Sequence, residues 1–369
     1  MKTEEETTDK ADMVETQWFL FQRKFRRHKL AMTALVVLTI MFICGVLFPG
    51  FFAPYSMRHR FENEYQPPQN IRFVDAEENF HFRPFTYNVI QVLDEETWQY
   101  ANHIDTSKRY PIQFFTHGDT YNLMGLFETD IHLFGFKDGG TLFLFGTDKL
   151  GRDILSRSLY ALRISMVIGL MGVFLSIFLG VIIGGISGFV GGIIDDLIQR
   201  FIEIIMSIPQ IPLWMAFAAA IPRDWSAIDR YFAITLIMSI LGWTTLSRVV
   251  RSKFLSMREE DYITAAIGFN VPMLRLIRVH MIPNFMSYIL VHLTLAIPGM
   301  ILGETALSFL GIGLQAPVVS LGVLLQDGQN IQDITMHPWL LIPGVFVIMI
   351  VLTYSFIGDG LRDAADPYK

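Results

Sequence analysis

Seven long stretches of this 369-residue chain contain no Asp, Glu, Lys or Arg. They are residues 30–57, 164–194, 204–222, 231–247, 279–303, 305–326 and 334–358. Only 17% of all residues are charged, against roughly 25% in soluble globular proteins, so charge is missing where contact with water would demand it. A helix needs about 20 mostly apolar residues to cross the ~30 Å hydrocarbon core of a bilayer. The stretches therefore predict an all-α, polytopic membrane protein.

Six of the seven stretches predict transmembrane helices, and residues 305–326 are the exception. This stretch contains Gly311, Gly313 and Pro317, which interrupt a helix and leave backbone groups unpaired in lipid. We therefore predict an irregular or re-entrant segment that packs against protein. The predicted organisation is an amino-terminal segment (1–29), a first membrane helix (30–57), an inserted domain (58–145), a membrane core with helices two to six (146–361) and a tail (362–369).

The distribution of basic residues predicts that both termini are cytoplasmic. With six helices, fourteen Lys and Arg residues fall in segments 15–29, 188–203, 248–278 and 359–369, whereas two fall in segments 222–230 and 304–337. Lys and Arg are enriched in the cytoplasmic loops of membrane proteins. The acidic and polar residues 1–16 differ from the start of a cleavable signal peptide.

The inserted segment 58–145 predicts a small folded extracytoplasmic domain of mixed or β-rich structure. Aromatic residues recur from Phe61 to Phe136, whereas a disordered loop would contain few of them. We expect strands near 110–115 and 141–145. Because the segment has no cysteine, packing alone must hold it, with support from the membrane helices. It is either a docking surface or gate for a soluble partner, or a cap that stabilises the bundle.

Several classes of function find no support in the sequence. The net charge of −6 provides no basic surface for nucleic acid. Cys44 is the only cysteine, and His280, His292 and His337 are too scattered for a metal site. The chain lacks the G-x-x-x-x-G-K-[ST] loop that cradles nucleotide phosphates. We therefore expect no enzyme activity, metal or cofactor on this chain itself.

Residues 257–284, MREEDYITAAIGFNVPMLRLIRVHMIPN, form the most informative loop. They predict two short helical stretches with a break near Asn270–Pro272, and a proline, Pro283, at the start of the next span. A plain connector between two helices would account for such a loop. A structured cytoplasmic loop is also what a membrane protein needs to receive mechanical input from a soluble partner.

This loop resembles the coupling loop of ABC importer permeases, whose pattern is Glu-Ala-Ala, three residues, Gly, nine residues and Ile-x-Leu-Pro. The chain has Thr264-Ala265-Ala266, then Asn270, and then His280-Met281-Ile282-Pro283. Thr264 replaces the Glu of the pattern, which puts in doubt any polar contact of that Glu. Asn270 replaces the Gly, and Asn tolerates a left-handed backbone better than most residues.

The resemblance extends in order along nearly all of the chain outside residues 58–144. It is similar to the dipeptide/oligopeptide/nickel branch of these permeases, and to its C-type subunit with a long first outer loop. The segments that carry the similarity are FRRHKLAMTALVVL (25–38), FGTDKLGRDILSRSLYALRIS (145–165), GFVGGIIDDLIQRFIEIIMSIPQIPL (188–213), GETALSFLGIGLQAP (303–317) and IGDGLRDAADP (357–367).

The resemblance implies the six-helix type I ABC importer permease fold and a subunit of an ATP-driven, binding-protein-dependent importer in a prokaryotic inner membrane. It implies a second homologous permease, two ATP-binding subunits that carry ATP and Mg, and an extracytoplasmic solute-binding protein. Peptides are the first expectation as solute, with oligosaccharides or nickel complexes as alternatives. The residues it assigns to ATPase coupling, within loop 257–278 and the start of the next span, are Asp261, Thr264, Ala265, Ala266, Asn270, Arg275 and Pro283.

Two carboxylates, Glu203 and Glu304, fall at membrane depth. Exposing a charge to lipid costs at least ~2.5 kcal/mol, so each should face a pathway, an ion-pair partner or the hydrogen-bonding groups of a broken helix. Arg200 is placed to pair with Glu203 at spacing i,i+3. As coupling carboxylates they would fit an ion-coupled secondary transporter, although no internal repeat supports that class. A membrane sensor is a third class, but the predicted cytoplasmic tail is short for one.

Glycines recur at every fourth position in the second predicted span and at its exit. Such spacing lets the backbones of two helices approach closely. We therefore predict a close helix–helix contact along Gly180, Gly184, Gly188 and Gly192.

Overall fold

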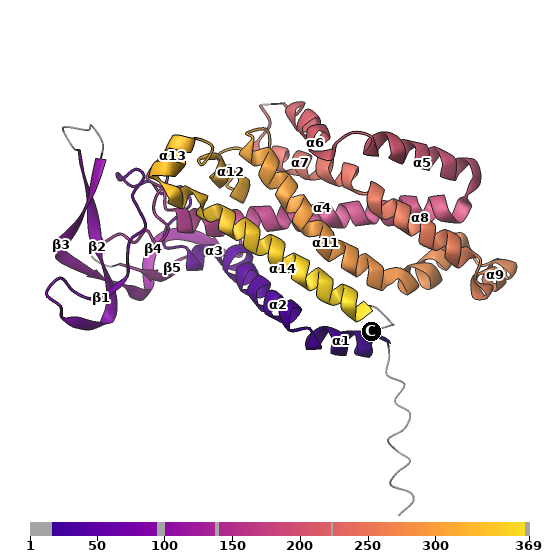
Figure 1. Ribbon diagram of the computed structural model, residues 1–369, viewed down its shortest axis with the longest axis horizontal. Coiled ribbons are helices and arrows are strands. Elements are labelled where there is room, and N and C mark those ends of the chain that lie inside the picture. Colours follow the sequence, from indigo (N-terminus) through magenta and orange to yellow (C-terminus); the bar gives the residue numbers. More distant parts are fainter. Residues whose placement is uncertain (1–16, 94–99, 137–139, 223, 366–369) are drawn as a thin grey trace, which may run out of the picture.

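The computed structural model describes residues 17–93, 100–136, 140–222 and 224–365. It consists of a helical bundle with a β-domain at one end, as Figure 1 shows. The helices before the β-domain are α1 (Gln17–Arg27), α2 (Lys29–Met41), a π-helical turn (Phe42–Leu47) and α3 (Pro49–Phe52). Those after it are α4 (Ile154–Val190), α5 (Gly192–Met206), α6 (Gln210–Ala219), α7 (Ala227–Gly242), α8 (Thr244–Arg258), α9 (Asp261–Gly268), α10 (Met273–Arg275), α11 (Ile282–Phe309), α12 (Leu321–Gln326), α13 (Ile331–Met336) and α14 (Ile342–Ala365).

Within the described residues, five continuous helical segments are long and apolar enough to cross a membrane. They are Lys29–Leu47, Ile154–Val190, Ala227–Arg258, Leu276–Phe309 and Pro338–Ala365. The helices α5 and α6 form a bent pair that makes a sixth segment if it is counted as one span. The prediction of a polytopic helical membrane protein is confirmed.

The stretch 204–222 is not the regular helix that its apolar sequence predicted. The chain turns by 85° between α5 and α6, at residues Ser207–Pro209. Pro209 has no backbone N–H and its ring collides with the preceding turn, so it kinks or breaks a helix, and here the helix is broken. The 231–247 span is longer than predicted, because α7 and α8 together run from Ala227 to Arg258.

The irregular segment predicted within 305–326 is confirmed. Helix α11 ends at Phe309, and the chain then runs without regular structure to Ser320, which caps α12 by accepting a hydrogen bond from the Val323 amide. Gly313 lies so close to Ser308 that a Cβ would come within 2.5 Å of the Ser308 nitrogen. The segment is therefore packed against the end of α11.

The β-domain contains two antiparallel sheets. Strands β1 (Arg72–Val74), β2 (Phe80–Leu93) and β3 (Tyr100–Pro111) form one sheet in the order β1-β2-β3. Strands β4 (Gln113–Leu123) and β5 (Phe127–Gly135) form a hairpin. This confirms the β-rich inserted domain, and the predicted strand at 110–115 corresponds to the end of β3 and the start of β4.

No strand forms at residues 141–145, so that prediction is wrong. Phe143 is fully buried, its amide donates to Oε1 of Gln69 at 2.7 Å, and its carbonyl accepts from the Gln69 amide at 2.9 Å. The Gln69 side chain thus accepts the hydrogen bond that the backbone of a neighbouring strand would accept in a sheet. The segment is extended and apolar, but it does not join a sheet.

Several contacts tie the β-domain and the segments that flank it to the helical bundle, as expected for a domain without disulfides, and three of them involve the region between α12 and α14. The Trp339 indole donates to the Thr147 carbonyl at 3.0 Å, and Lys149 pairs with Asp327 at 2.8 Å. The rings of Tyr65 and His337 stack with centroids 4.2 Å apart.

Helix α4 links the two ends of the molecule. Its 37 residues span about 55 Å, which is longer than the hydrocarbon core of a bilayer. Asp153 caps its start by accepting from the Ser156 amide at 2.7 Å. Burial raises the pKa of Asp153 to about 6.

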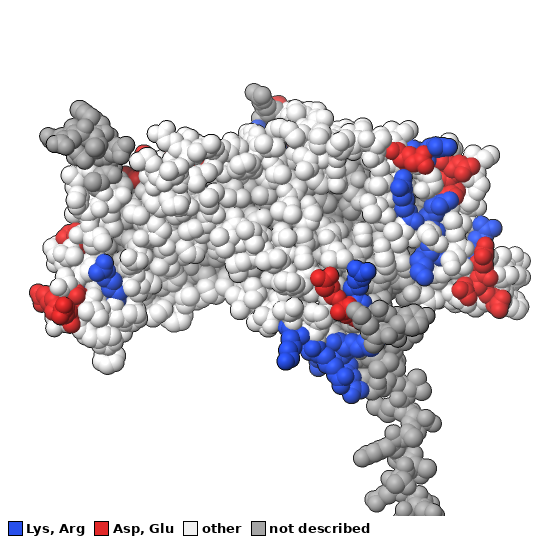
Figure 2. All heavy atoms as spheres, in the orientation of Figure 1, with Lys and Arg blue, Asp and Glu red and all other residues white. Residues whose placement is uncertain are grey.

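Charged side chains gather at both ends of the molecule, and Figure 2 shows an almost uncharged band between them. The β-domain occupies one end. The opposite end carries charges around α5, α8 and α9. A further group of basic side chains lies along the lower edge of this view, near α1, whose last turn contains Lys24, Arg26 and Arg27. This is the pattern expected of a protein that crosses a bilayer along this axis.

Candidate functional site

The loop singled out by its motif lies at the end of the bundle opposite the β-domain (Figure 1). It begins at the end of α8, includes α9 and α10, and re-enters the bundle through a π-helical turn (Leu276–Met281) and α11. Ile263, Leu276 and Met281 are almost fully buried in the hydrophobic core. These three side chains fix the loop to the bundle at defined points.

The predicted break at Asn270–Pro272 is confirmed. Asn270 has a left-handed backbone with φ of +54°, a conformation that asparagine tolerates. Its amide donates to the Ile267 carbonyl at 2.9 Å, and the Val271 amide donates to the Ala266 carbonyl at 3.1 Å. Asn270 therefore ends α9 with a left-handed residue. The Gly of the family pattern would adopt this conformation readily, and Asn can replace it here.

The other predicted coupling residues fall on the outside of the same loop. Asp261, Thr264, Ala265 and Arg275 are exposed, and Ala266 is half-buried. Pro283 is exposed in the first turn of α11, beside Asn284, whose side chain donates to the Tyr262 hydroxyl at 3.0 Å. The structure thus gathers the predicted residues at one end of the molecule, and it leaves their proposed role in coupling as a prediction.

The sequence motif did not single out Phe269, which is the most prominent side chain of this surface. It is 84% exposed, and Tyr262 and Ile267 beside it are also exposed. These three residues, which we call the α9 apolar surface, belong to a loop that also contains charged residues and lies outside the spans. The signal available in the sequence was the apolar run Ile-Gly-Phe just before the break at Asn270.

Helix α8 connects the loop to the rest of the bundle. Helix α8 packs along α4 at the predicted glycine contact, where a Cβ at Gly184 would lie 2.4 Å from the Ser247 carbonyl oxygen and one at Gly188 would lie 2.6 Å from that of Arg251. Gly180 also faces α8, whereas Gly192 has no neighbour within 4 Å. The prediction is confirmed for three of the four glycines.

An ion pair adds α5 to this connection. Both Nε and Nη2 of Arg251 donate to the Asp195 carboxylate at 2.5 Å, and the Ser187 hydroxyl donates to the same carboxylate. Arg258 donates to the Phe189 carbonyl at 3.0 Å. Helix α8, which leads directly into the loop, is therefore joined to both α4 and α5.

The two predicted membrane-depth carboxylates have different surroundings. Glu203 is on the surface of α5, with half of its side chain exposed, and it accepts from Arg200 at 2.8 Å as the i,i+3 spacing predicted. Glu304 on α11 is fully buried. It accepts from the Ser165 hydroxyl at 3.1 Å and the Ser308 hydroxyl at 2.7 Å.

These serines connect Glu304 to the irregular segment. The Ser308 hydroxyl accepts from the Leu314 amide at 3.0 Å, and the Ser165 hydroxyl accepts from the Leu321 amide at 3.2 Å. Glu304 therefore holds α4, α11 and the 310–320 segment together. The geometry favours the hydrogen-bonding role for Glu304 and leaves Glu203 as the carboxylate with an exposed face.

Glu304→Leu should lower the free energy of unfolding by about 1–3 kcal/mol, because two buried serine hydroxyls would lose their acceptor. Glu304→Gln should cost less, since its carbonyl oxygen can still accept. The measurement is unfolding of the purified chain in mixed micelles. Glu203→Leu is the matched control and should cost below about 1 kcal/mol, because exposed ion pairs contribute little. Equal losses at both positions would contradict this role for Glu304.

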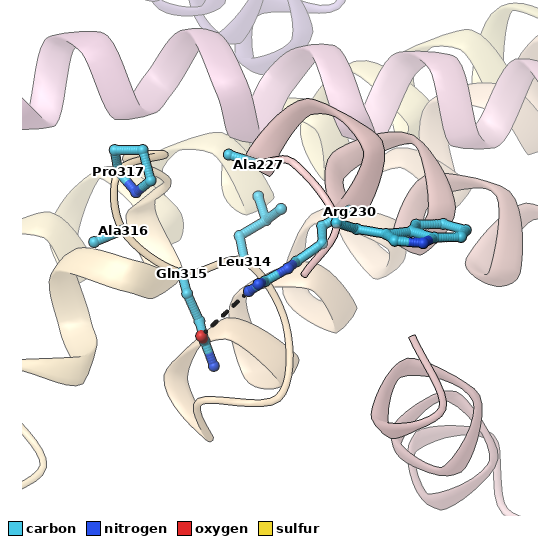
Figure 3. A pocket seen from close by; sticks show the side chains of 7 residues that line it. Ala227, Arg230, Leu314, Gln315, Ala316 and Pro317 are labelled. Carbon is cyan, nitrogen blue, oxygen red and sulfur yellow. Dashed lines mark hydrogen bonds between the residues drawn. The ribbon is translucent and has the colours of Figure 1, made fainter. Parts of the chain in front are cut away.

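A small cavity lies where the irregular segment approaches α7. Figure 3 shows Arg230 of α7 and Gln315 pointing toward each other, with 3.4 Å between the guanidinium and the amide oxygen. Trp225, Ala227, Leu314, Ala316 and Pro317 complete its lining. Its volume of about 100 Å³ is far below the ~300 Å³ at which pockets for organic ligands begin. This cavity alone does not hold a peptide-sized solute.

Together, a bundle of membrane helices, a β-domain at one end and an exposed helical loop at the other define a multi-pass membrane protein. Residues 176–368 match the family model described as the binding-protein-dependent transport system inner membrane component. Residues 16–68 match the N-terminal transmembrane domain of oligopeptide transport permease C. The chain belongs to the family of binding-protein-dependent transport system inner membrane components.

Relatives support the same assignment. The chain is 40% identical over 255 residues to the oligopeptide transport system permease protein OppC of Haemophilus influenzae. This match covers 69% of this chain and 76% of the relative. It is 37% identical to the OppC protein and 35% identical to the dipeptide transport system permease protein DppC of Bacillus subtilis, each over 224 residues. These matches cover 60% of this chain and 71% and 68% of the relatives. The resemblance to the permeases of this branch is confirmed, and the family is one of transport subunits.

Proposed function

We propose that this chain is a transmembrane subunit of an ATP-driven importer that carries peptides into the cell. The relatives named above are oligopeptide and dipeptide permeases, which supports peptides over oligosaccharides or nickel complexes. The single observation that supports coupling to ATP hydrolysis is the α9 apolar surface. It is exposed at the end of a helix that is packed continuously against α4.

In this proposal the loop with α9 is cytoplasmic and the β-domain is extracytoplasmic. The excess of Lys and Arg on the α9 side supports this orientation. Cysteines introduced at the exposed positions Thr120 of β4 and Asn270 should then react with an impermeant reagent from opposite sides of the membrane.

The two ATP-binding subunits, which hold ATP and Mg, would contact the α9 surface and Asp261, Thr264, Ala265, Ala266, Asn270, Arg275 and Pro283 around it. Closure of these subunits would push on α9, and α8 would transmit the movement to α4 and α5 through the glycine contact and the Asp195–Arg251 pair. The solute pathway would form between this chain and a second, homologous permease, with Glu203 as the carboxylate that remains accessible. A solute-binding protein would deliver the peptide at the β-domain.

Purification through a tag on this chain, in mild detergent, tests the proposal. We expect a second permease and two ATP-binding subunits to be recovered, and proteoliposomes of the complex with its binding protein to accumulate a labelled oligopeptide only with ATP. Unlabelled peptides should compete, whereas oligosaccharides and nickel chelates should not. Recovery of a stable chain without partners, with uptake driven by an ion gradient, would contradict it and favour a secondary transporter.

A further inference from the structure

The turn of the β4–β5 hairpin has an unusual composition for a turn in water. Residues 123–127 are Leu-Met-Gly-Leu-Phe, and the side chains of Leu126 and Phe127 are 74% and 68% exposed. Met124 and Gly125 both have positive φ, of 52° and 75°. Hairpins in water usually place Asn, Asp or Gly at such positions, because a large apolar side chain is strained there and gains nothing from solvent.

The hairpin is fixed beside the end of the first membrane span. Its Tyr121 ring lies against Gly50 of α3, so that a Cβ at Gly50 would come within 2.2 Å of the ring. His132 of β5 contacts the Gly50 and Ala53 carbonyls through Nδ1 at 2.8 Å and 2.6 Å. Helix α3 begins two residues after the span Lys29–Leu47 ends. The middle of the hairpin is therefore held at the boundary of the bilayer.

The exposed apolar surface continues from this boundary onto the hairpin. Phe115 of β4, which is itself largely exposed, contacts Phe51 of α3 with ring centroids 6.2 Å apart. Below α3, the exposed side chains Val36, Ile40 and Ile43 belong to the outer face of the first span. Exposed apolar side chains thus occur on the hairpin, at its contact with α3 and on the outer face of the first span.

Exposed basic side chains follow α3 closely in the chain. The exposed Arg58 and Arg60 flank His59, whose ring contacts the Asp119 carboxylate of β4 at 2.9 Å. Cationic side chains are favourable at the headgroup level of a membrane, while apolar side chains insert just below it.

From these observations we infer that the β4–β5 turn, residues 123–127, is a lipid anchor that inserts into the outer leaflet beside α3. Its occupant is the bilayer, and its role is to hold the β-domain at a fixed height and tilt over the membrane helices. This inference does not depend on which solute the protein carries or on what drives transport.

Spin labels at single cysteines test the anchor. Cys44 is the only cysteine, so a Cys44→Ala background with Leu126→Cys provides one label at the turn. The matched control is Phe82→Cys on β2, since Phe82 is 93% exposed and lies on the other sheet of the domain. Both variants are purified with the subunits that accompany the chain and reconstituted into phospholipid bilayers.

We expect the label at position 126 to be several-fold more accessible to oxygen, relative to a water-soluble nickel chelate, than the label at position 82. Oxygen concentrates in the hydrocarbon and the chelate stays in water. Equal accessibility ratios at the two positions would overturn the inference. Protection of position 126 from both reagents would also overturn it, because the turn would then be buried against a protein, such as a second permease.

Discussion

Replacing Phe269 with Asp should weaken the association of this subunit with the ATP-binding subunits that we propose as its partners by roughly 30-fold, or about 2 kcal/mol. An aromatic side chain that is 84% exposed in the free chain can bury most of its surface in a complementary pocket. Such buried aromatic anchors carry most of the binding energy at many interfaces. The measurement is a titration of the ATP-binding subunits onto the detergent-solubilised permease, together with ATP-dependent uptake in proteoliposomes.

The chain offers a control of the same residue type. Phe82 is 93% exposed on β2, at the opposite end of the molecule, so Phe82→Asp makes the same chemical change far from α9. It should leave the affinity for the ATP-binding subunits unchanged. If Phe269→Asp bound these subunits as tightly as Phe82→Asp, the α9 apolar surface would not be their docking site.

Gly184→Leu should destabilise the bundle by more than about 3 kcal/mol, at the upper end of the cost of overpacking. A Cβ at Gly184 would lie 2.4 Å from the carbonyl oxygen and 2.9 Å from the Cα of Ser247. Both obstacles are backbone atoms of α8, so no change of side-chain rotamer can relieve the clash, and α8 must move away from α4. The free energy of unfolding in mixed micelles measures the loss.

Gly299 provides the comparison, because it is a helical, exposed glycine of α11 with no neighbour within 4 Å of an added Cβ. Gly299→Leu should be neutral or slightly stabilising, since glycine is a poorer helix former than leucine by up to ~1 kcal/mol. Equal destabilisation by the two substitutions would mean that the α4–α8 contact is looser than its geometry indicates. In the proposed mechanism, Gly184→Leu should also reduce uptake, because α8 would transmit the movement of α9 to α4 less directly.

The membrane spans could be predicted from the sequence because a charge in lipid is so costly that its absence over about 20 residues is informative by itself. The same reasoning could not predict the bend between α5 and α6. Hydropathy contains no information about the direction of the backbone. The presence of Pro209 alone does not distinguish a mild kink from a bend of 85°. The strand expected at 141–145 failed for a related reason, since an apolar extended segment can pair with a side chain, here Gln69.

The candidate site was predictable where the chemistry is local. The turn at Asn270 and the Arg200–Glu203 pair depend on neighbours within a few residues, and both were confirmed. Only half of the environment of Glu304 could be predicted from the sequence, because Ser308 is one helical turn away whereas Ser165 lies on another helix. Phe269 was missed because the motif does not include its position. The exposure of a side chain next to a motif is known only once the fold is known.

The corner between α5 and α6 has a consequence for how cells must supply this subunit. Ser207, Ile208 and Pro209 are exposed in the middle of an apolar stretch, next to the exposed pair Arg200–Glu203. Hydrocarbon offers no hydrogen bonds to an open turn and no solvation to a charged pair, so a copy without a neighbour has an unfavourable flank in the bilayer. We therefore expect orphan copies to be short-lived and removed by membrane proteases. If the neighbour is the second permease proposed above, matched synthesis of the two chains would then set how many transporters a cell can keep.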